Sequence, residues 1–413
     1  MPGYRRGIIR QQIIAIFFAI IGILIILSYA PRLGHPDPTI SRLTFGLGGP
    51  VLNVPTAIVM FSIGVIYFSS GIPGLFRRWE RGTRWALWLN GLLFVPMVLI
   101  AAAAGKQTNI LTMIAETLRL GTPLALGALA GLYCERSGVI NIAIEGMMLF
   151  GAAFGFATLI FTGNIWLGVL TAVLLGGIAA LLHGWLSIHL QTDQIVSGTV
   201  LNILAIGVTG YLRRSYLLSS LGGRVTLPTI PIPLLSDIPL LGNVLFHNKP
   251  IFYTMLILVV STHIVLFYTP WGLRARSVGE NPRAADTLGI NVYRTRYLNV
   301  LIGGMIAGLA GAWFSLETVG SFDDGMTSGK GFIALAAMIF GKWTPFGAFG
   351  GAMLFGFAEA LGTRFQILNV ELWGSPIPIQ FLQTLPYITT IVVLAGLIGR
   401  ATPPAAIGQP YQK

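Results

Sequence analysis

Long apolar runs, separated by short polar stretches, follow one another through nearly the whole chain. Most approach the roughly 20 residues that an α-helix needs to cross a bilayer. Because only helices and closed barrels satisfy their backbone hydrogen bonds in lipid, runs of this length predict helices. We expect segments at 13–30, 51–72, 85–104, 110–131, 143–161, 166–188, 193–212, 251–269, 298–316, 346–362 and 381–398, with an incomplete one at 331–341.

Composition supports the same fold class. Apolar residues make up 54% of the chain and charged residues only 10%, whereas typical soluble domains are about 25% charged. The sequence therefore predicts an all-α polytopic membrane protein with about 11–12 transmembrane segments, two of them interrupted or half-spans. Glycines spaced four apart let helices approach closely in lipid, which supports a tightly packed bundle. They are Gly127/Gly131, Gly151/Gly155, Gly304/Gly308 and Gly347/Gly351.

Basic residues indicate the orientation of the spans. Arg5, Arg6 and Arg10 precede the first run, which is long for a secretory signal and lacks a small-residue cleavage site. We therefore expect an uncleaved first span with a cytoplasmic N-terminus. The arginine-dense stretch 271–297 should also be cytoplasmic. Alternation of the spans then places the C-terminal tail, 401–413, on the same side.

Several other functions are disfavoured by the sequence. A net charge of +12 fits basic loops beside anionic lipid headgroups, so it does not indicate nucleic-acid binding. One cysteine, Cys134, and five scattered histidines form no metal-ligand cluster. No phosphate-binding G-x-x-x-x-G-K-[ST] motif and no hydrolase or kinase motif occurs. We expect no metal, no bound cofactor and no ATP hydrolysis on this chain, and we expect it not to be an enzyme.

The arginine-dense stretch contains a short helix with both ends marked in the sequence. Asn281 is a good N-cap, and Pro282 suits the first helical position. Gly289 favours the left-handed conformation that ends a helix. One face of this helix should be formed by Ala284, Ala285 and Leu288. A helix of about two turns is unstable alone in water, so it needs its own membrane domain or a partner to lie against. The residues alone favour an interfacial turn and a partner contact equally.

Two motifs resemble a known family. GENPRAADTLGINV, at 279–292, resembles the cytoplasmic coupling loop in permease subunits of binding-protein-dependent ABC importers. The match is to the branch that carries simple sugars, nucleosides and branched-chain amino acids, where this helix docks in a groove of the ATP-hydrolysing subunit. ERSGVINIAIEGMM, at 135–148, is similar to the signature of nucleoside-type permeases. The resemblance implies coupling to an ATPase through Gly279, Glu280, Asn281, Pro282, Ala284, Ala285 and Gly289.

The resemblance also implies an organisation and a set of partners. Residues 1–107 would be an extension with three transmembrane helices, and 108–400 the permease domain, with the coupling loop 271–297 inside it. The tail, 401–413, would be cytoplasmic. The implied assembly lies in the plasma membrane of a prokaryote and contains two permeases (like or unlike), two ATPase subunits that bind ATP, and an extracytoplasmic substrate-binding protein. The implied activity is the import of nucleosides.

Polar residues inside the apolar runs are candidates for the translocation pathway. Paired interruptions of spans in the two halves of a transporter indicate its binding region, and here they are 132–146 and 341–346. The candidates are Asn141, Glu145, Asn202, Glu116 and Glu359. Structural alternatives exist: Asn141 could cap the next helix, and Glu116 could pair with Arg119.

Other functions fit parts of the sequence. Within the same class, the substrate could be a simple sugar or a branched-chain amino acid. A different class would be an ion-coupled secondary transporter that uses Glu116, Glu145 or Glu359, whose uptake an uncoupler would abolish. A membrane enzyme acting on lipid is disfavoured, because no His/Asp/Ser cluster lies near one interface. Asp323 and Asp324, in an outer loop, could be solvated or could meet a substrate-delivery protein.

Overall fold

The structure is a computed structural model that describes residues 2–35, 39–46, 49–75, 80–218, 225–372, 375–392 and 401–412. The chain divides into two compact units, which are described one at a time. The first unit is Met1–Ile114 with Leu361–Leu397, and the second is Ala115–Ala360 with Ile398–Lys413.

Three helices and a small sheet form most of the first unit. The helices are α1 (Pro2–Tyr29), α2 (Thr56–Leu75) and α3 (Glu80–Ala102). They pack around a core that includes the fully buried Tyr67, whose hydroxyl donates to the carbonyl oxygen of Asn90 (2.9 Å). The predicted helix at 51–72 is wrong at its start, because Val51–Pro55 pairs as a strand and the helix begins only at Thr56.

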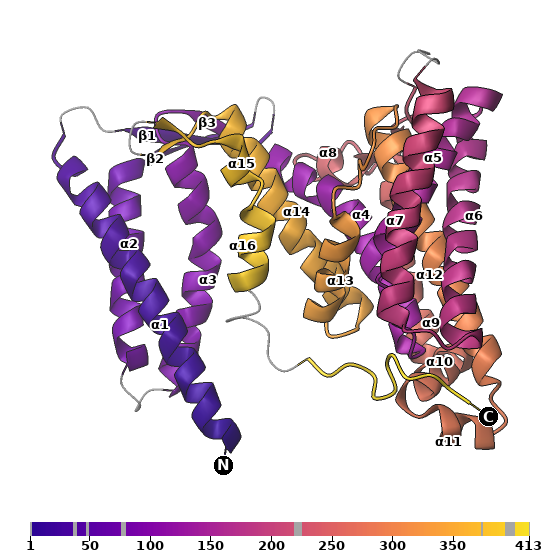
Figure 1. The fold of residues 1–413 in the computed structure, drawn as a ribbon. Coiled ribbons are helices and arrows are strands. Elements are labelled where there is room, and N and C mark those ends of the chain that lie inside the picture. The colour runs from indigo at the N-terminus through magenta and orange to yellow at the C-terminus, as the bar shows by residue number, and fades with distance from the viewer. Residues whose placement is uncertain are drawn as a thin grey trace. The chain divides into compact units, whose positions relative to one another are not determined.

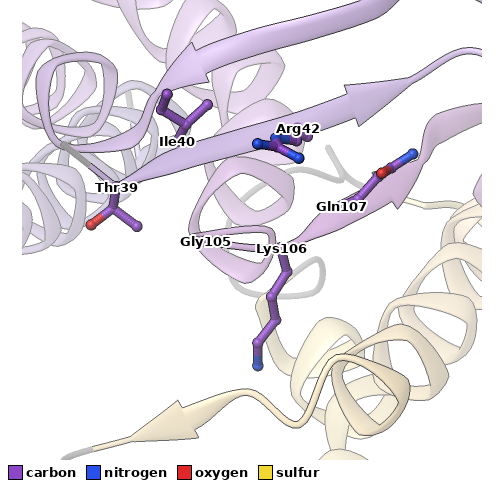
Figure 2. Close-up of a pocket in the computed structure, with 6 residues that line it drawn as sticks. All are labelled: Thr39, Ile40, Arg42, Gly105, Lys106 and Gln107. Atoms are coloured by element: carbon purple, nitrogen blue, oxygen red, sulfur yellow. The ribbon is translucent and has the colours of Figure 1, made fainter. Parts of the chain in front are cut away.

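The sheet joins stretches that are far apart in sequence. β1 (Ile40–Thr44) pairs antiparallel with β2 (Val51–Pro55) and parallel with β3 (Gln107–Asn109). Beside it lies a pocket of about 400 Å³ lined by Thr39, Ile40, Arg42, Gly105, Lys106 and Gln107 (Figure 2). The ammonium group of Lys106 donates to the carbonyl oxygens of Leu368 and Asn369. The sheet is thereby tied to the segment after α14.

The remaining part of the first unit comes from the end of the chain. It comprises the last turns of α14 (Pro345–Ile367), the two-residue strands β6 (Glu371–Leu372) and β7 (Ser375–Pro376), α15 (Ile379–Leu382) and α16 (Leu385–Val392). Arg364 Nε donates to the hydroxyl of Thr108 (2.7 Å). The end of α14 therefore binds the strand that leads into α4.

The second unit is a helical bundle. Its helices are α4 (Ile110–Arg136), α5 (Ile144–Thr162), α6 (Ile165–Gly184), α7 (Gln194–Leu212), α8 (Gly242–Leu245), α9 (Pro250–Tyr268), α10 (Pro270–Glu280), α11 (Pro282–Thr287), α12 (Val292–Ala312) and α13 (Lys330–Phe340), with most of α14. Wider π-helical turns extend α6, α7 and α12, at Trp185–His189, Arg213–Leu217 and Trp313–Val319. Figure 1 shows α5, α6, α7 and α12 side by side. Two-residue strands, β4 (Ile230–Pro231) and β5 (His247–Asn248), pair before α9.

The predicted fold class is confirmed. Each of the twelve predicted segments contains a helix, and within the described residues seven helices are long and apolar enough to cross a membrane. The protein is therefore a multi-pass α-helical membrane protein. The half-span predicted at 331–341 is the eleven-residue α13.

An acidic loop of the second unit is held by the chain itself. Arg213, the first residue of the π-helical turn that extends α7, pairs with Asp323 (2.7 Å) and Asp324 (3.5 Å). Its Nε also donates to the carbonyl oxygen of Phe322 (3.2 Å). The carboxylates that the sequence offered for a delivery protein thus have a partner on the same chain.

Candidate functional site

Two breaks interrupt the helices of the second unit, and the end of α4 contacts the second of them. The first is 137–143, between α4 and α5, and the second is 341–344, between α13 and α14. At the second break, Lys342 and Trp343 have φ of +53° and +52°, a left-handed conformation that is strained for such residues. Trp343 Nε1 donates to Glu135 Oε2 (2.6 Å), and Arg136 Nε and Nη2 donate to the carbonyl oxygen of Trp343 (2.9 and 2.6 Å). The last two residues of α4 therefore hold the second break.

Glu145, in the first turn of α5, binds the start of α13. Its Oε1 accepts hydrogen bonds from Thr327 Oγ1 (2.6 Å) and the amide of Gly329 (2.8 Å), and its Oε2 accepts from the amide of Gly331 (2.6 Å). The first amides of a helix have no partner within the helix, and its positive end favours an anion. Glu145 is buried and caps α13 from another helix. The α4–α5 region thus fixes both ends of α13.

A second carboxylate reaches the same end of α13. Glu359, on α14, forms an ion pair with Lys330, the first residue of α13 (2.9 Å). Both side chains are part-exposed, at 29% and 17% respectively. Glu145 and Glu359, two of the predicted pathway residues, therefore both contact residues within 327–331. Of the two, the Glu359 pair is the more accessible to a solute.

Asn141 lies in the first break and Asn202, on α7, contacts it, and the two differ in role. Asn202, on α7, accepts from the amide of Gly146 (2.8 Å) and donates to the carbonyl oxygen of Ile142 (3.0 Å). It thus satisfies two backbone groups that the break leaves without helical partners. Asn141 is fully buried, and its amide nitrogen lies 3.3 Å from Cys134 Sγ. The alternative that Asn141 caps α5 is wrong, because the N-cap is Ala143 and no side chain caps it.

Removing the Asn202 side chain should loosen the first break. Asn202→Ala is expected to cost about 1–3 kcal/mol, since it leaves buried backbone groups of Gly146 and Ile142 unsatisfied. Thermal unfolding of the detergent-purified protein measures this as a lower melting temperature. Thr199→Ala, one turn earlier on an exposed part of α7, is the control and should leave the melting temperature unchanged. Equal melting temperatures for Asn202→Ala and wild type would contradict the assigned role.

Glu116 is not part of this cluster of contacts. In the described part of the chain it makes no ion pair with Arg119, so that alternative is wrong, and its Oε2 is buried without a hydrogen-bond partner. The structure thus brings four of the five predicted pathway residues to the breaks and to the start of α13, and leaves Glu116 outside their hydrogen bonds.

The predicted coupling helix is α11, and its ends form as the sequence indicates. Asn281 Oδ1 accepts from the amide of Ala284 (3.1 Å), Pro282 is the first helical residue, and Gly289 has φ of +81°. Ala285 is buried, whereas Leu288 is 80% exposed and Ala284 is exposed. The prediction that these three residues share one face is therefore wrong. Ala285 faces the protein, and Leu288 faces outward.

The coupling loop packs directly on the first break. A Cβ added to Gly279, in α10, would lie 2.2 Å from the carbonyl oxygen of Arg136, so only glycine allows this approach. Glu280, the next residue, accepts from the amide of Ala405 in the C-terminal tail (3.2 Å). The chain thus places an exposed, capped helix next to the residues that hold α13.

Comparison with known proteins identifies the family to which this chain belongs. Residues 113–398 match the model of the branched-chain amino acid transport system / permease component family. The chain belongs to this family. It is 41% identical to a guanosine ABC transporter permease of Bacillus subtilis and 39% identical to a nucleoside ABC transporter permease of Lactococcus lactis, each alignment covering 73% of this chain and 96% of the relative. A putative glucose ABC transporter permease of Haloferax volcanii is 37% identical over 72% of this chain and 96% of its own length. No solved structure matches.

Membership of this family shows which class of transporter the chain belongs to. The protein is a permease component of an ABC transporter, and an ion-coupled secondary transporter is no longer a competing interpretation. The structure agrees, because Glu145 of the permease accepts three hydrogen bonds and Glu359 is ion-paired.

One buried carboxylate of the permease escaped the sequence reasoning. Glu317, in the π-helical turn after α12, is buried and accepts from the amide of Ile251 at the start of α9 (2.8 Å). It caps α9 from another helix, as Glu145 caps α13. The available signal was an acidic residue directly after the apolar run 298–316. Nothing in the sequence indicates that its partner is Ile251, which lies 66 residues earlier. Burial also lowers the pKa of Lys249, the N-cap of α9, and the nearby Glu317 partly opposes this.

Proposed function

We propose that this permease imports nucleosides as the membrane-spanning subunit of an ATP-driven importer. The observation that carries the proposal is the similarity, over nearly their whole length, to permeases named for guanosine and for nucleosides. The sequence 135–148, which forms the first break and its Glu145 contact, supports the same substrate class. A simple sugar is the second candidate, because a putative glucose permease is 37% identical.

The partners follow from the same class of transporter. ATP is bound and hydrolysed on two separate ATPase subunits, so this chain itself has no catalytic role and holds no cofactor. A second permease, identical or different, completes the pathway, and an extracytoplasmic binding protein delivers the substrate. Both termini lie in the cytoplasm of a prokaryote, and the basic residues near the N-terminus and in 271–297 support this orientation.

The contacts suggest how ATP binding reaches the pathway. The ATPase binds the exposed side of α11, next to Leu288. When the ATPase moves, α11 and α10 move together. Gly279 of α10 lies against the end of α4, whose Glu135 and Arg136 hold Trp343 at the end of α13. Movement of the coupling loop is therefore passed to the two breaks as a rigid-body displacement. In this mechanism Asn141, Asn202 and Glu145 support the breaks, and the accessible Lys330–Glu359 pair faces the solute. Glu116 remains a predicted pathway residue outside these contacts.

The contact with the ATPase is tested by a charge on α11. Leu288→Asp should abolish copurification of the ATPase subunit in detergent, because an exposed apolar contact becomes a desolvated carboxylate. The fold should survive, since Leu288 is 80% exposed and a surface substitution usually changes the unfolding free energy by less than about 0.5 kcal/mol. Leu288→Met is the matched control and should retain the ATPase. Unchanged copurification with Leu288→Asp would remove α11 as the docking element.

The substrate class is tested by competition. Uptake of labelled guanosine by the complete transporter should fall in the presence of unlabelled uridine or adenosine and should be unaffected by glucose or leucine. Uptake of labelled glucose, with no uptake of labelled guanosine, would replace the nucleoside assignment with the sugar one.

A further inference from the structure

Residues 404–412, near the end of the chain, are fastened to the coupling loop and to the first break at once. Figure 1 shows the C-terminal end of the chain beside α10 and α11. The amide of Ala406 donates to the carbonyl oxygen of Gly279 in α10 (2.9 Å), and the amide of Gly408 donates to the carbonyl oxygen of Gly138 in the break (3.0 Å). Two residues of the tail thus join two elements that the proposed mechanism requires to move together.

Tyr411 anchors the segment beneath the coupling helix. Its side chain is buried, its ring lies 5.5 Å from that of Tyr293, and its carbonyl oxygen accepts from Tyr293 Oη (3.2 Å) and Gln191 Nε2 (3.3 Å). The apolar cluster around the ring contains Val278, Ala285 and Val292. Ala285 is the buried residue of α11, so the tail supplies part of the apolar surface against which the coupling helix packs.

A buried arginine also depends on the tail. Arg296, on α12, is 1% exposed, and its Nη1 donates to the carbonyl oxygen of Gln409 (3.1 Å). Its Nε and Nη2 have no hydrogen-bond partner in the described part of the chain. Without the tail, this guanidinium would lose the acceptor that it has and would remain in a site where unpaired polar groups are costly. The segment therefore contacts a buried side chain of α12, and not only the surface of the bundle.

We propose that 404–412 is a fixed bracket of the coupling machinery, which holds α10 and α11 against the α4–α5 break. This inference rests on the proposed coupling of α11 to an ATPase. The reasoning is mechanical: α11 has only six residues and is joined to its neighbours at Asn281 and Gly289, so alone it could rotate without moving the bundle. The bracket removes that freedom, because it binds α10, the break, the α6–α7 turn and α12 together.

The bracket is tested first by removing its aromatic anchor. In proteoliposomes that contain the complete transporter, Tyr411→Ala should retain the ATPase subunit but lower guanosine uptake per ATP hydrolysed by about three- to thirty-fold, the range for residues that carry coupling between sites. Tyr411→Phe keeps the ring and is the matched control, with uptake close to that of wild type. Full coupling in a folded Tyr411→Ala complex would overturn the proposal.

A crosslink tests whether the bracket is fixed. Gln412 Nε2 donates to Gln191 Oε1 (2.8 Å), so the double variant Gln191→Cys/Gln412→Cys can be joined by a short bifunctional thiosulfonate, which forms a disulfide with each thiol and is cleaved by a reductant. Uptake should be the same before and after crosslinking. Loss of uptake that cleavage of the crosslink restores would mean that the tail must detach during transport, and this also overturns the proposal.

Two controls separate the possible failures. If Tyr411→Ala gives no monodisperse complex, Gly408→Ala takes its place, because Gly408 has φ of +73° and an added Cβ would lie 2.8 Å from Ile140 Cδ1. A wild-type permease that copurifies with no ATPase would refute the proposed function itself. A wild-type complex that couples normally, alongside bracket variants that also couple normally, would refute the bracket alone.

Discussion

Replacing Glu145 with alanine is expected to destabilise the second unit more than any other single loss of a side chain in this site. Glu145 accepts hydrogen bonds from Thr327, Gly329 and Gly331, and the alanine would leave these donors buried without an acceptor. A buried group that loses its hydrogen-bond partner costs about 1–3 kcal/mol, and here three donors lose theirs at once. A Cβ on Gly331 would lie 2.5 Å from the amide nitrogen of Glu145, so the elements are too closely packed for water to fill the gap without a shift.

The measurement is thermal unfolding and monodispersity of the detergent-purified permease. Glu145→Ala should lower the melting temperature strongly. Glu145→Gln should fall in between, because the amide keeps one acceptor oxygen but directs its own N–H groups at other donors. Glu359→Gln is the control: its carboxylate is also near the start of α13 but is 29% exposed, so its loss should have little effect. Equal melting temperatures for Glu145→Ala and Glu359→Gln would show that Glu145 does not hold α13.

Local signals in the sequence predicted local structure well. Asn281, Pro282 and Gly289 fix the ends of α11 through interactions that span only a few residues, and all three occur as expected. The length of the apolar runs likewise predicted a helix in each of twelve segments. Each span must satisfy its own backbone hydrogen bonds in lipid, so each could be predicted independently of the others. The two breaks were visible because polar and glycine residues interrupt apolar runs.

Features that depend on distant partners could not be predicted in the same way. Val51–Pro55 is as apolar as the helix that follows it, and only its pairing with Ile40–Thr44 makes it a strand. The contacts of Glu145 with the start of α13 could not be predicted, because its partners lie more than 180 residues further along the chain. The tail, 401–413, was predicted only to be cytoplasmic, with no contact assigned to it. Its attachment uses backbone amides and carbonyls, which every sequence possesses.

Gly308→Ala is expected to disrupt the packing of α12 against α6, although it adds only one methyl group. The new Cβ would lie 2.1 Å from the carbonyl oxygen of Ala172, and backbone atoms cannot move aside as a flexible side chain can. The two helices must therefore separate, which costs about 1–3 kcal/mol or more and weakens the close approach that stabilises helix pairs in lipid.

The matched control is Gly207→Ala in α7, where an added Cβ would meet no atom within 4 Å. Alanine is the better helix former by about 1 kcal/mol, so this variant should be as stable as wild type or slightly more stable. Thermal unfolding of the two variants in the same detergent compares one methyl group in two surroundings. Similar melting temperatures would mean that α6 and α12 are not in backbone contact. A large loss confined to Gly308→Ala would assign the destabilisation to the α6–α12 contact, because the intrinsic helix preference predicts the opposite sign.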